Sequence, residues 1–258
     1  MAAQQTRPEA GAVAAAGFWR PATVAVAVLA LLSLLLWSGW LALDIPAGYF
    51  LLLHTTLEVA AVVVAMLGFG IAWDAYSRER PGRIVVLGLA LFGTALLDFG
   101  HTLAYAGMPD WITPSGPQKS IGFWLAARLL AALGLLAVAL QGWQPLASER
   151  TRHALLAGVL AYVGGTYALM LLWPEAVPVW FVPGQGLTPT KVYVEYALVA
   201  LYLVAALLLL RRALRPGAAA AEARADLDLF AAAAIAALSE LFFTRYERVT
   251  DLINATGH

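Results

Sequence analysis

The chain has 258 residues, of which 62% are hydrophobic and only 12% are charged. A soluble globular domain carries roughly 25% charged residues, so this chain has too little polar surface for a soluble particle of its size. Lysine plus arginine and aspartate plus glutamate both number 16, which leaves no excess positive charge for binding nucleic acid. The chain has no cysteine, which excludes disulfides, thiolate metal sites and a cysteine nucleophile. The composition therefore predicts a protein whose main solvent is the lipid bilayer.

Seven apolar stretches follow an N-terminal tail of residues 1–21. A helix needs roughly 20 apolar residues to cross a bilayer, and each stretch reaches or approaches that length. None alternates with the period of two that is typical of a transmembrane β-barrel. The sequence predicts an all-α, polytopic transmembrane helical bundle with about seven spans, at residues 22–41, 49–72, 84–105, 120–140, 154–173, 192–210 and 227–244.

The distribution of lysine and arginine predicts the orientation of the bundle. Four such residues lie in one set of connections, and Arg128 lies inside a span. Eleven lie in the tail and in the alternate connections: Arg7, Arg20, Arg78, Arg80, Arg83, Arg150, Arg152, Arg211, Arg212, Arg215 and Arg224. Because cytoplasmic loops carry the excess of positive charge, we expect a multi-pass protein of the bacterial inner membrane with a cytoplasmic N-terminus. Seven spans would leave His258 outside, so we expect an eighth span beyond it.

Ionisable side chains within the predicted spans are candidates for a functional site, because they are costly in a membrane. With the orientation above, all seven fall in the outer half of the bilayer. They are His54, Glu58, Asp98, His101, Arg128, Glu195 and Glu240.

Two of the spacings place ionisable pairs on one face of a helix. His54 and Glu58 are four residues apart, and Asp98 and His101 are three apart. Two histidines and two carboxylates on facing helices can bind a transition metal, with His54, Glu58, Asp98 and His101 as ligands. The two histidines could instead hold a haem iron, with Arg128 near a propionate. A third interpretation is a lattice of buried ion pairs that only fixes helix packing.

The charges of the cluster favour a cationic or protonatable signal. Arg128 is the only cation counted within the spans, and it can satisfy one or two carboxylates. Leaving the remaining carboxylates buried and unpaired would cost several kcal/mol per ion. We therefore expect His54 and His101 to respond to protons or to a bound cation.

Several short sequence motifs occur in order along the chain, in the part from about residue 22 to the end. They are His54-Thr55-Thr56-Leu57-Glu58, Asp98-Phe99-Gly100-His101, Phe123-Trp124-Leu125-Ala126-Ala127-Arg128, Gly186-Leu187-Thr188 with Lys191 and Glu195, Ser239-Glu240, and Asp251, Asn254, Gly257 and His258. These motifs resemble a family of bacterial membrane-associated sensor (MASE-type) domains, the third of that series. The resemblance implies that residues 22–258 are a sensor domain, cut off before its last helix and its output domain.

The resemblance also implies a function and a set of shared polar positions. In this family the sensor feeds a cytoplasmic output domain, either a histidine kinase or an enzyme of cyclic-di-GMP signalling. The implied ligand-binding or sensing residues are His54, Glu58, Asp98, His101, Arg128, Glu195, Glu240 and His258. The expected partners are the lipid bilayer, the output domain and a second copy in a homodimer, with no nucleic acid.

Two other functions stay open at this point. A transporter or channel for a small solute or cation would carry ionisable groups through the midplane, whereas the inner halves of these spans are almost purely apolar. A membrane metallohydrolase would use His54 and His101 to activate water. No nucleophile elbow, phosphate-binding loop or zinc-protease motif is present, so we expect a sensor domain without catalytic activity of its own.

Overall fold

The computed structural model describes residues 23–258 apart from 25, 36, 39–44, 77–80 and 246–251. The described part is almost wholly helical, which confirms the predicted all-α class. The long helices are α2 (Ala47–Ala75), α3 (Arg83–Ala104), α4 (Pro117–Gln141), α5 (Glu149–Leu172), α6 (Pro189–Ala213) and α7 (Ala220–Phe242). Two short strands, β1 (Phe181–Val182) and β2 (Gly186–Leu187), pair as an antiparallel hairpin, and the short helix α8 (Leu252–Gly257) follows α7.

Five helices, α2 to α6, are long and apolar enough to cross a membrane. They confirm five of the seven predicted spans. The seventh prediction is not confirmed, because α7 begins at Ala220 and carries too many charged residues, namely Glu222, Arg224, Asp226, Asp228 and Glu240. Within the predicted first span the described residues form a shorter apolar helix, Val26–Leu35, and the other residues of that span are mostly outside the described part.

Local sequence signals explain where several helices begin. Ser148 accepts a hydrogen bond from the backbone N–H of Thr151 and so caps the N-terminus of α5. Thr188 caps α6 in the same way, accepting from the backbone of Lys191. Prolines occupy the first position of both α4 and α6, where a missing N–H costs nothing.

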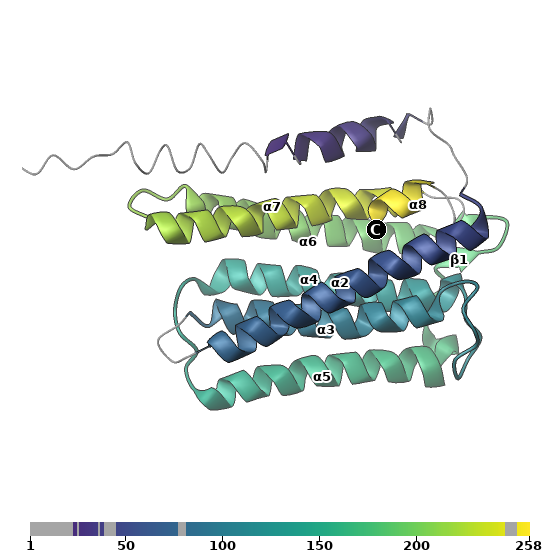
Figure 1. Ribbon diagram of the computed structural model, residues 1–258, viewed down its shortest axis with the longest axis horizontal. Coiled ribbons are helices and arrows are strands. Elements are labelled where there is room, and N and C mark those ends of the chain that lie inside the picture. Colours follow the sequence, from purple (N-terminus) through teal and green to yellow (C-terminus); the bar gives the residue numbers. More distant parts are fainter. Residues whose placement is uncertain (1–22, 25, 36, 39–44, 77–80, 246–251) are drawn as a thin grey trace, which may run out of the picture.

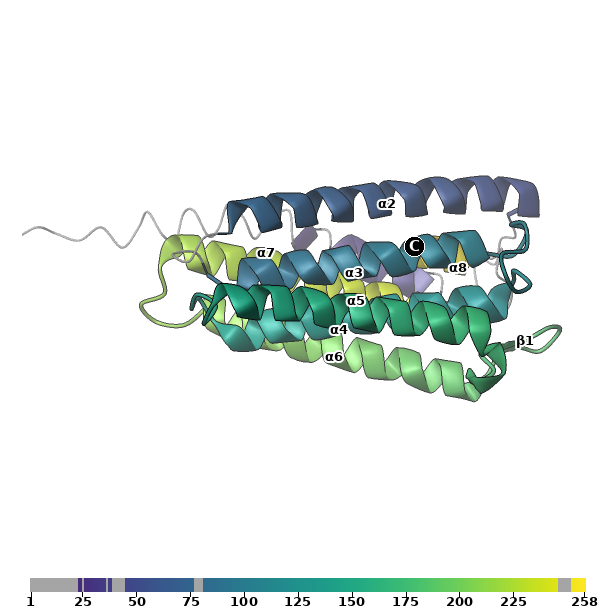
Figure 2. The ribbon, with the colours of Figure 1, turned by 90° about the horizontal axis from the view of Figure 1, so that it is seen from below.

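The helices pack as a bundle in which successive connections lie at opposite ends (Figure 1). Along the chain, α2 packs on α3, α3 packs on α4 and α5, α4 packs on α6, and α6 packs on α7. The helix α2 crosses the bundle obliquely (Figure 1) and lies on its outside (Figure 2). Its long row of exposed apolar side chains, which includes Leu52, Val64 and Ile71, is what a lipid-facing surface requires.

The core lies where α3 and α4 approach each other. Leu97, Phe123 and Ala127 are fully buried there. A Cβ atom added to Gly134 would lie 2.4 Å from the Cβ of Ala90, so glycine at this position permits the close approach of the two helices.

One end of the bundle, where α3 and α7 begin and α6 ends, carries a buried charge network. Nη1 of Arg83 lies 2.6 Å from Asp226, and Nε of Arg212 lies 3.4 Å from the other oxygen of the same carboxylate. We call this the arginine-rich end, because further arginines lie there, in the first turns of α5 and α7, in the last turn of α6 and just after it: Arg150, Arg152, Arg211, Arg215 and Arg224. The network joins α3 to the α6–α7 pair.

Candidate metal site

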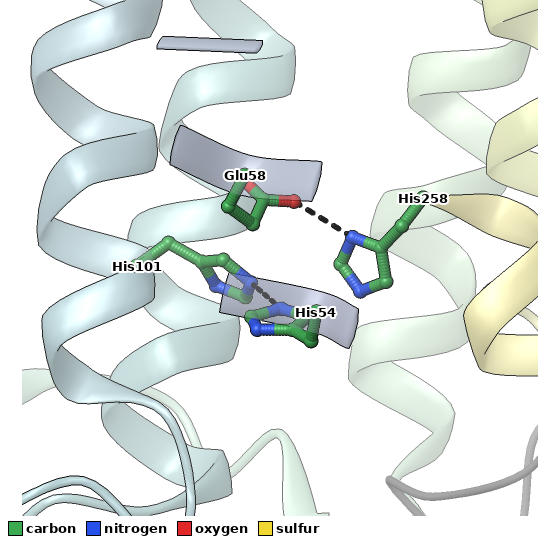
Figure 3. A group of neighbouring side chains, drawn as sticks. All are labelled: His54, Glu58, His101 and His258. Atoms are coloured by element: carbon green, nitrogen blue, oxygen red, sulfur yellow. Dashed lines mark hydrogen bonds and ion pairs between the residues drawn. The ribbon is translucent and has the colours of Figure 1, made fainter. Parts of the chain in front are cut away.

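Three of the four histidines of the chain meet in one buried cluster in the half of the bundle away from the arginine-rich end. His54 and Glu58 lie one turn apart on α2, His101 lies near the end of α3, and His258 directly follows α8. Each side chain offers one ligand atom, and these atoms all lie within 4.8 Å of one another (Figure 3). We call these four residues the histidine cluster.

Hydrogen bonds fix the orientation of two of the three imidazoles. Nδ1 of His101 lies 2.8 Å from the backbone carbonyl oxygen of Ser120, which can only accept, so Nδ1 carries the proton. Nδ1 of His258 lies 2.9 Å from Oε1 of Glu58 and donates to that carboxylate. In a neutral imidazole the other nitrogen, Nε2, then carries a lone pair. That of His101 accepts a hydrogen bond from Nε2 of His54, a proton that a bound ion would replace. The rings of His101 and His258 are therefore held in the tautomer that binds metal through Nε2.

The spacing of the three rings fits a common central ion. Nε2 of His54 and Nε2 of His101 are 3.1 Å apart. The ring centroids are separated by 4.6 Å for His54 and His258, 5.1 Å for His54 and His101, and 5.7 Å for His101 and His258. Three imidazoles around a tetrahedral zinc ion, with Zn–N bonds of about 2.0–2.1 Å, would place nitrogens about 3.3 Å apart and centroids about 5 Å apart. The cluster is thus close to the size of a three-histidine site.

Aromatic side chains enclose the cluster. The ring of Tyr105 stacks on His54 with centroids 3.8 Å apart, and Trp124 and Phe243 contact His258 edge-on at 4.8 Å and 5.1 Å. His54, Glu58 and His101 keep at most 5% of their surface exposed. Such walls exclude bulk water and hold the imidazoles in fixed rotamers.

The backbone before His258 is fixed by close packing on α7. Ser239 donates a hydrogen bond from its hydroxyl to the carbonyl oxygen of Gly257. A Cβ atom added to Gly257 would lie only 2.4 Å from the ring of Phe243, so only glycine allows this approach. Asn254 of α8 also donates to the hydroxyl of Tyr105, at 3.3 Å.

Asp98 and Arg128 form a separate ion pair. One guanidinium nitrogen of Arg128 lies 2.6 Å and 2.5 Å from the two carboxylate oxygens of Asp98, and the guanidinium stacks over Trp124 at 4.2 Å. Because Arg128 engages both oxygens, Asp98 is not part of the ligand group. The four residues whose ligand atoms converge thus include His258 and not Asp98, and the metal-ligand set expected from the sequence remains a prediction.

Glu195 and Glu240 also lie outside the histidine cluster. Nζ of Lys191 lies 2.8 Å from Glu195 and donates to the carbonyl oxygen of Phe243. Glu240 is buried on α7. Lys191 and Glu195 are almost completely inaccessible to solvent. The sequence analysis counted Arg128 as the only cation within the spans, but the structure buries Lys191 as well. The spacing of Lys191 four residues before Glu195 on one helix was the available signal for this pair.

A small cavity adjoins the cluster. It is lined by His101 and His258, by Lys191 and Asn254, and by aromatic side chains that include Tyr105 and Trp124. Its free space admits a water molecule or a single ion. A haem does not fit here: axial ligands on opposite faces of an iron would lie about 4 Å apart with the macrocycle between them, whereas the His54 and His101 nitrogens are 3.1 Å apart.

The fold and the buried cluster define a helical membrane protein with a polar site inside its bundle. Residues 45–258 match the model of the membrane-associated sensor domain family MASE3, and the chain belongs to that family. The match confirms the resemblance and gives the chain a role in sensory input. Comparison with curated proteins and with solved structures gives no match.

Proposed function

We propose that this chain is the sensory input domain of a bacterial signal-transduction protein and that it detects a divalent first-row transition metal ion. His54, His101 and His258 would supply the ligands through Nε2. Membership of the sensor family supports the sensory role. We propose a metal ion as the signal because three buried imidazoles, from three segments of the chain, converge on one point.

The donor set selects the class of metal. Imidazole suits zinc, copper, iron and nickel, whereas calcium and magnesium prefer oxygen ligands. The chain has no thiolate to select copper(I). Zinc, nickel and copper(II) are the ions that this cluster favours, and zinc is the first to test.

A bound ion would act on helix packing. It would tie α2 and α3 to the segment that follows α8, and it would favour the packing in which these three segments are closest. We propose that this shift reaches a cytoplasmic output domain, a histidine kinase or an enzyme of cyclic-di-GMP signalling, in an inner-membrane homodimer with a cytoplasmic N-terminus.

Binding can be tested on the purified full chain in detergent micelles or nanodiscs. Elemental analysis would measure the metal content after purification without chelators, and calorimetry would measure the affinity of the chelator-treated protein for zinc. We expect one ion per chain, and an affinity reduced by at least about 100-fold in the variants His54→Ala and His101→Ala.

His153 provides a matched control. It is the fourth histidine and is exposed on α5. Its ring bonds to the Glu149 carbonyl of its own helix and meets Trp73 edge-on at 5.9 Å. The variant His153→Ala should bind zinc as the unmodified chain does. Binding that is absent, or equal in all three variants, would contradict the proposal.

A further inference from the structure

Glu58 lies beside the proposed metal position as a support for a ligand. Its Oε1 accepts the proton of His258 Nδ1 at 2.9 Å, as in the carboxylate–histidine–metal arrangement of many metal sites. The three imidazoles are then the protein ligands, and a tetrahedral ion with three ligands keeps a fourth position open.

A small cavity adjoins the proposed ligands and offers space for a fourth one. Two of the three imidazoles, His101 and His258, line it, and Lys191 contributes to its wall. Its size limits an occupant to a few atoms, and Tyr105, Trp124 and Phe243 close off further space. The occupant would therefore meet the ion on one side and a lysine on another.

The charges around the cavity favour an anion. Glu58 neutralises only one of the two charges of a divalent ion. Among the other nearby carboxylates, Asp98 is paired with Arg128 and Glu195 with Lys191. Glu240 is buried and has no ion pair in the described part of the chain, and an isolated buried carboxyl group favours its neutral form. An uncompensated positive charge in a dry interior is costly, and a monoanion at the open position would remove it.

We infer that the ion in the histidine cluster takes a small monoanion from outside the protein as its fourth ligand, in the cavity between His101, His258 and Lys191. This inference rests on the proposed metal site. It makes the domain responsive to the ion and the anion together, because each increases the affinity for the other.

Cobalt(II) substitution makes the fourth ligand visible. The full chain, freed of metal and loaded with cobalt, should show the intense visible absorption of a four-coordinate cobalt ion. Titration with sodium azide, a narrow monoanion, should shift these bands with saturation. The variant Lys191→Met should keep the azide-free cobalt spectrum but require roughly tenfold more azide, because a nearby positive charge is lost.

Two further variants guard against misfolding and nonspecific effects. Lys191→Met leaves Glu195 buried without its cation, so the double variant Lys191→Met, Glu195→Gln should be made beside it. Lys119→Met is the matched control, because Lys119 is a buried lysine of α4 that binds the carbonyls of Trp111 and Thr113 and is not among the lining residues of the cavity. It should leave the azide titration unchanged.

The possible failures are distinguishable. A chain that gives no cobalt spectrum would contradict the proposed metal site itself. A four-coordinate cobalt spectrum that azide does not change would overturn the inference and leave the metal site standing. An azide response that is the same in the chain with Lys191 and in both Lys191 variants would also overturn it, because the anion would then bind elsewhere.

Discussion

Glu58 and His258 stand 200 positions apart in the sequence, yet Oε1 of Glu58 and Nδ1 of His258 are 2.9 Å apart. This contact ties the segment that follows α8 to the first half of α2. Because the carboxylate orients the imidazole, the contact also determines which nitrogen of His258 faces the proposed ion.

The first prediction concerns this contact. The variant Glu58→Gln keeps an oxygen that accepts from His258 but loses the negative charge, so zinc affinity should fall by about 10- to 100-fold without being lost. Glu58→Leu removes the acceptor as well and should weaken zinc binding further. Calorimetry on both variants measures the difference. Equal affinities for Glu58→Leu and the unmodified chain would show that Glu58 does not support the site.

The second prediction separates the ion pair from the metal site. In Asp98→Ala, Arg128 loses its carboxylate, and breaking a buried pair in this way typically costs about 3–5 kcal/mol of stability. The melting temperature in detergent should fall, whereas zinc affinity should stay within about a factor of three, because Asp98 is not a ligand. A loss of zinc binding as large as that of His101→Ala would return Asp98 to the ligand set.

The third prediction concerns the approach of α8 to α7. In Gly257→Ala the added methyl group meets the ring of Phe243, so the backbone must shift and carry His258 away from Glu58. We expect zinc affinity to fall by roughly the 10- to 100-fold typical of a disturbed supporting residue.

A matched glycine variant tests whether the effect is local. A Cβ atom at Gly165 of α5 meets nothing within 4 Å, so Gly165→Ala should leave zinc affinity unchanged. It should also raise the stability of α5 slightly, since alanine is a better helix former than glycine. Unchanged zinc binding in Gly257→Ala would mean that this packing does not position His258.

The fourth prediction concerns the arginine-rich end. Asp226→Ala removes the carboxylate shared by the buried Arg83 and the partly exposed Arg212, and the two cations then repel each other without compensation. We expect a loss of about 3–5 kcal/mol in stability. Asp228→Ala changes an exposed aspartate of the same helix and should have little effect. Both variants should bind zinc normally, since the histidine cluster lies in the other half of the bundle.

The fifth prediction tests the orientation of the bundle. The chain has no cysteine, so single cysteines can be placed without background labelling. Gln185→Cys in the β-hairpin should react with a membrane-impermeant maleimide on whole cells, and Ala218→Cys between α6 and α7 should react only after the membrane is opened. The reverse pattern would overturn the orientation that the arginine distribution predicts.

The sequence by itself determined the class of the protein and the location of five spans. Hydrophobic runs of about 20 residues identify membrane helices strongly, because the bilayer imposes both length and composition. The spacing of His54 and Glu58, and that of Asp98 and His101, also showed which side chains share a helix face. The predicted seventh span is not confirmed, because acidic residues interrupt the alanine-rich helix α7, which is apolar only on average.

Only the tertiary structure decided which ionisable groups become partners. Asp98 and Glu58 look equivalent in the sequence. The packing of α3 against α4 pairs Asp98 with Arg128, whereas Glu58 accepts a hydrogen bond from His258. Lys191 directly precedes the predicted span 192–210 and is buried beside Glu195. Spacing along one helix determines a face, but contacts between helices depend on the rotation and crossing of each pair, which small residues such as Gly134 and Gly257 set through close packing.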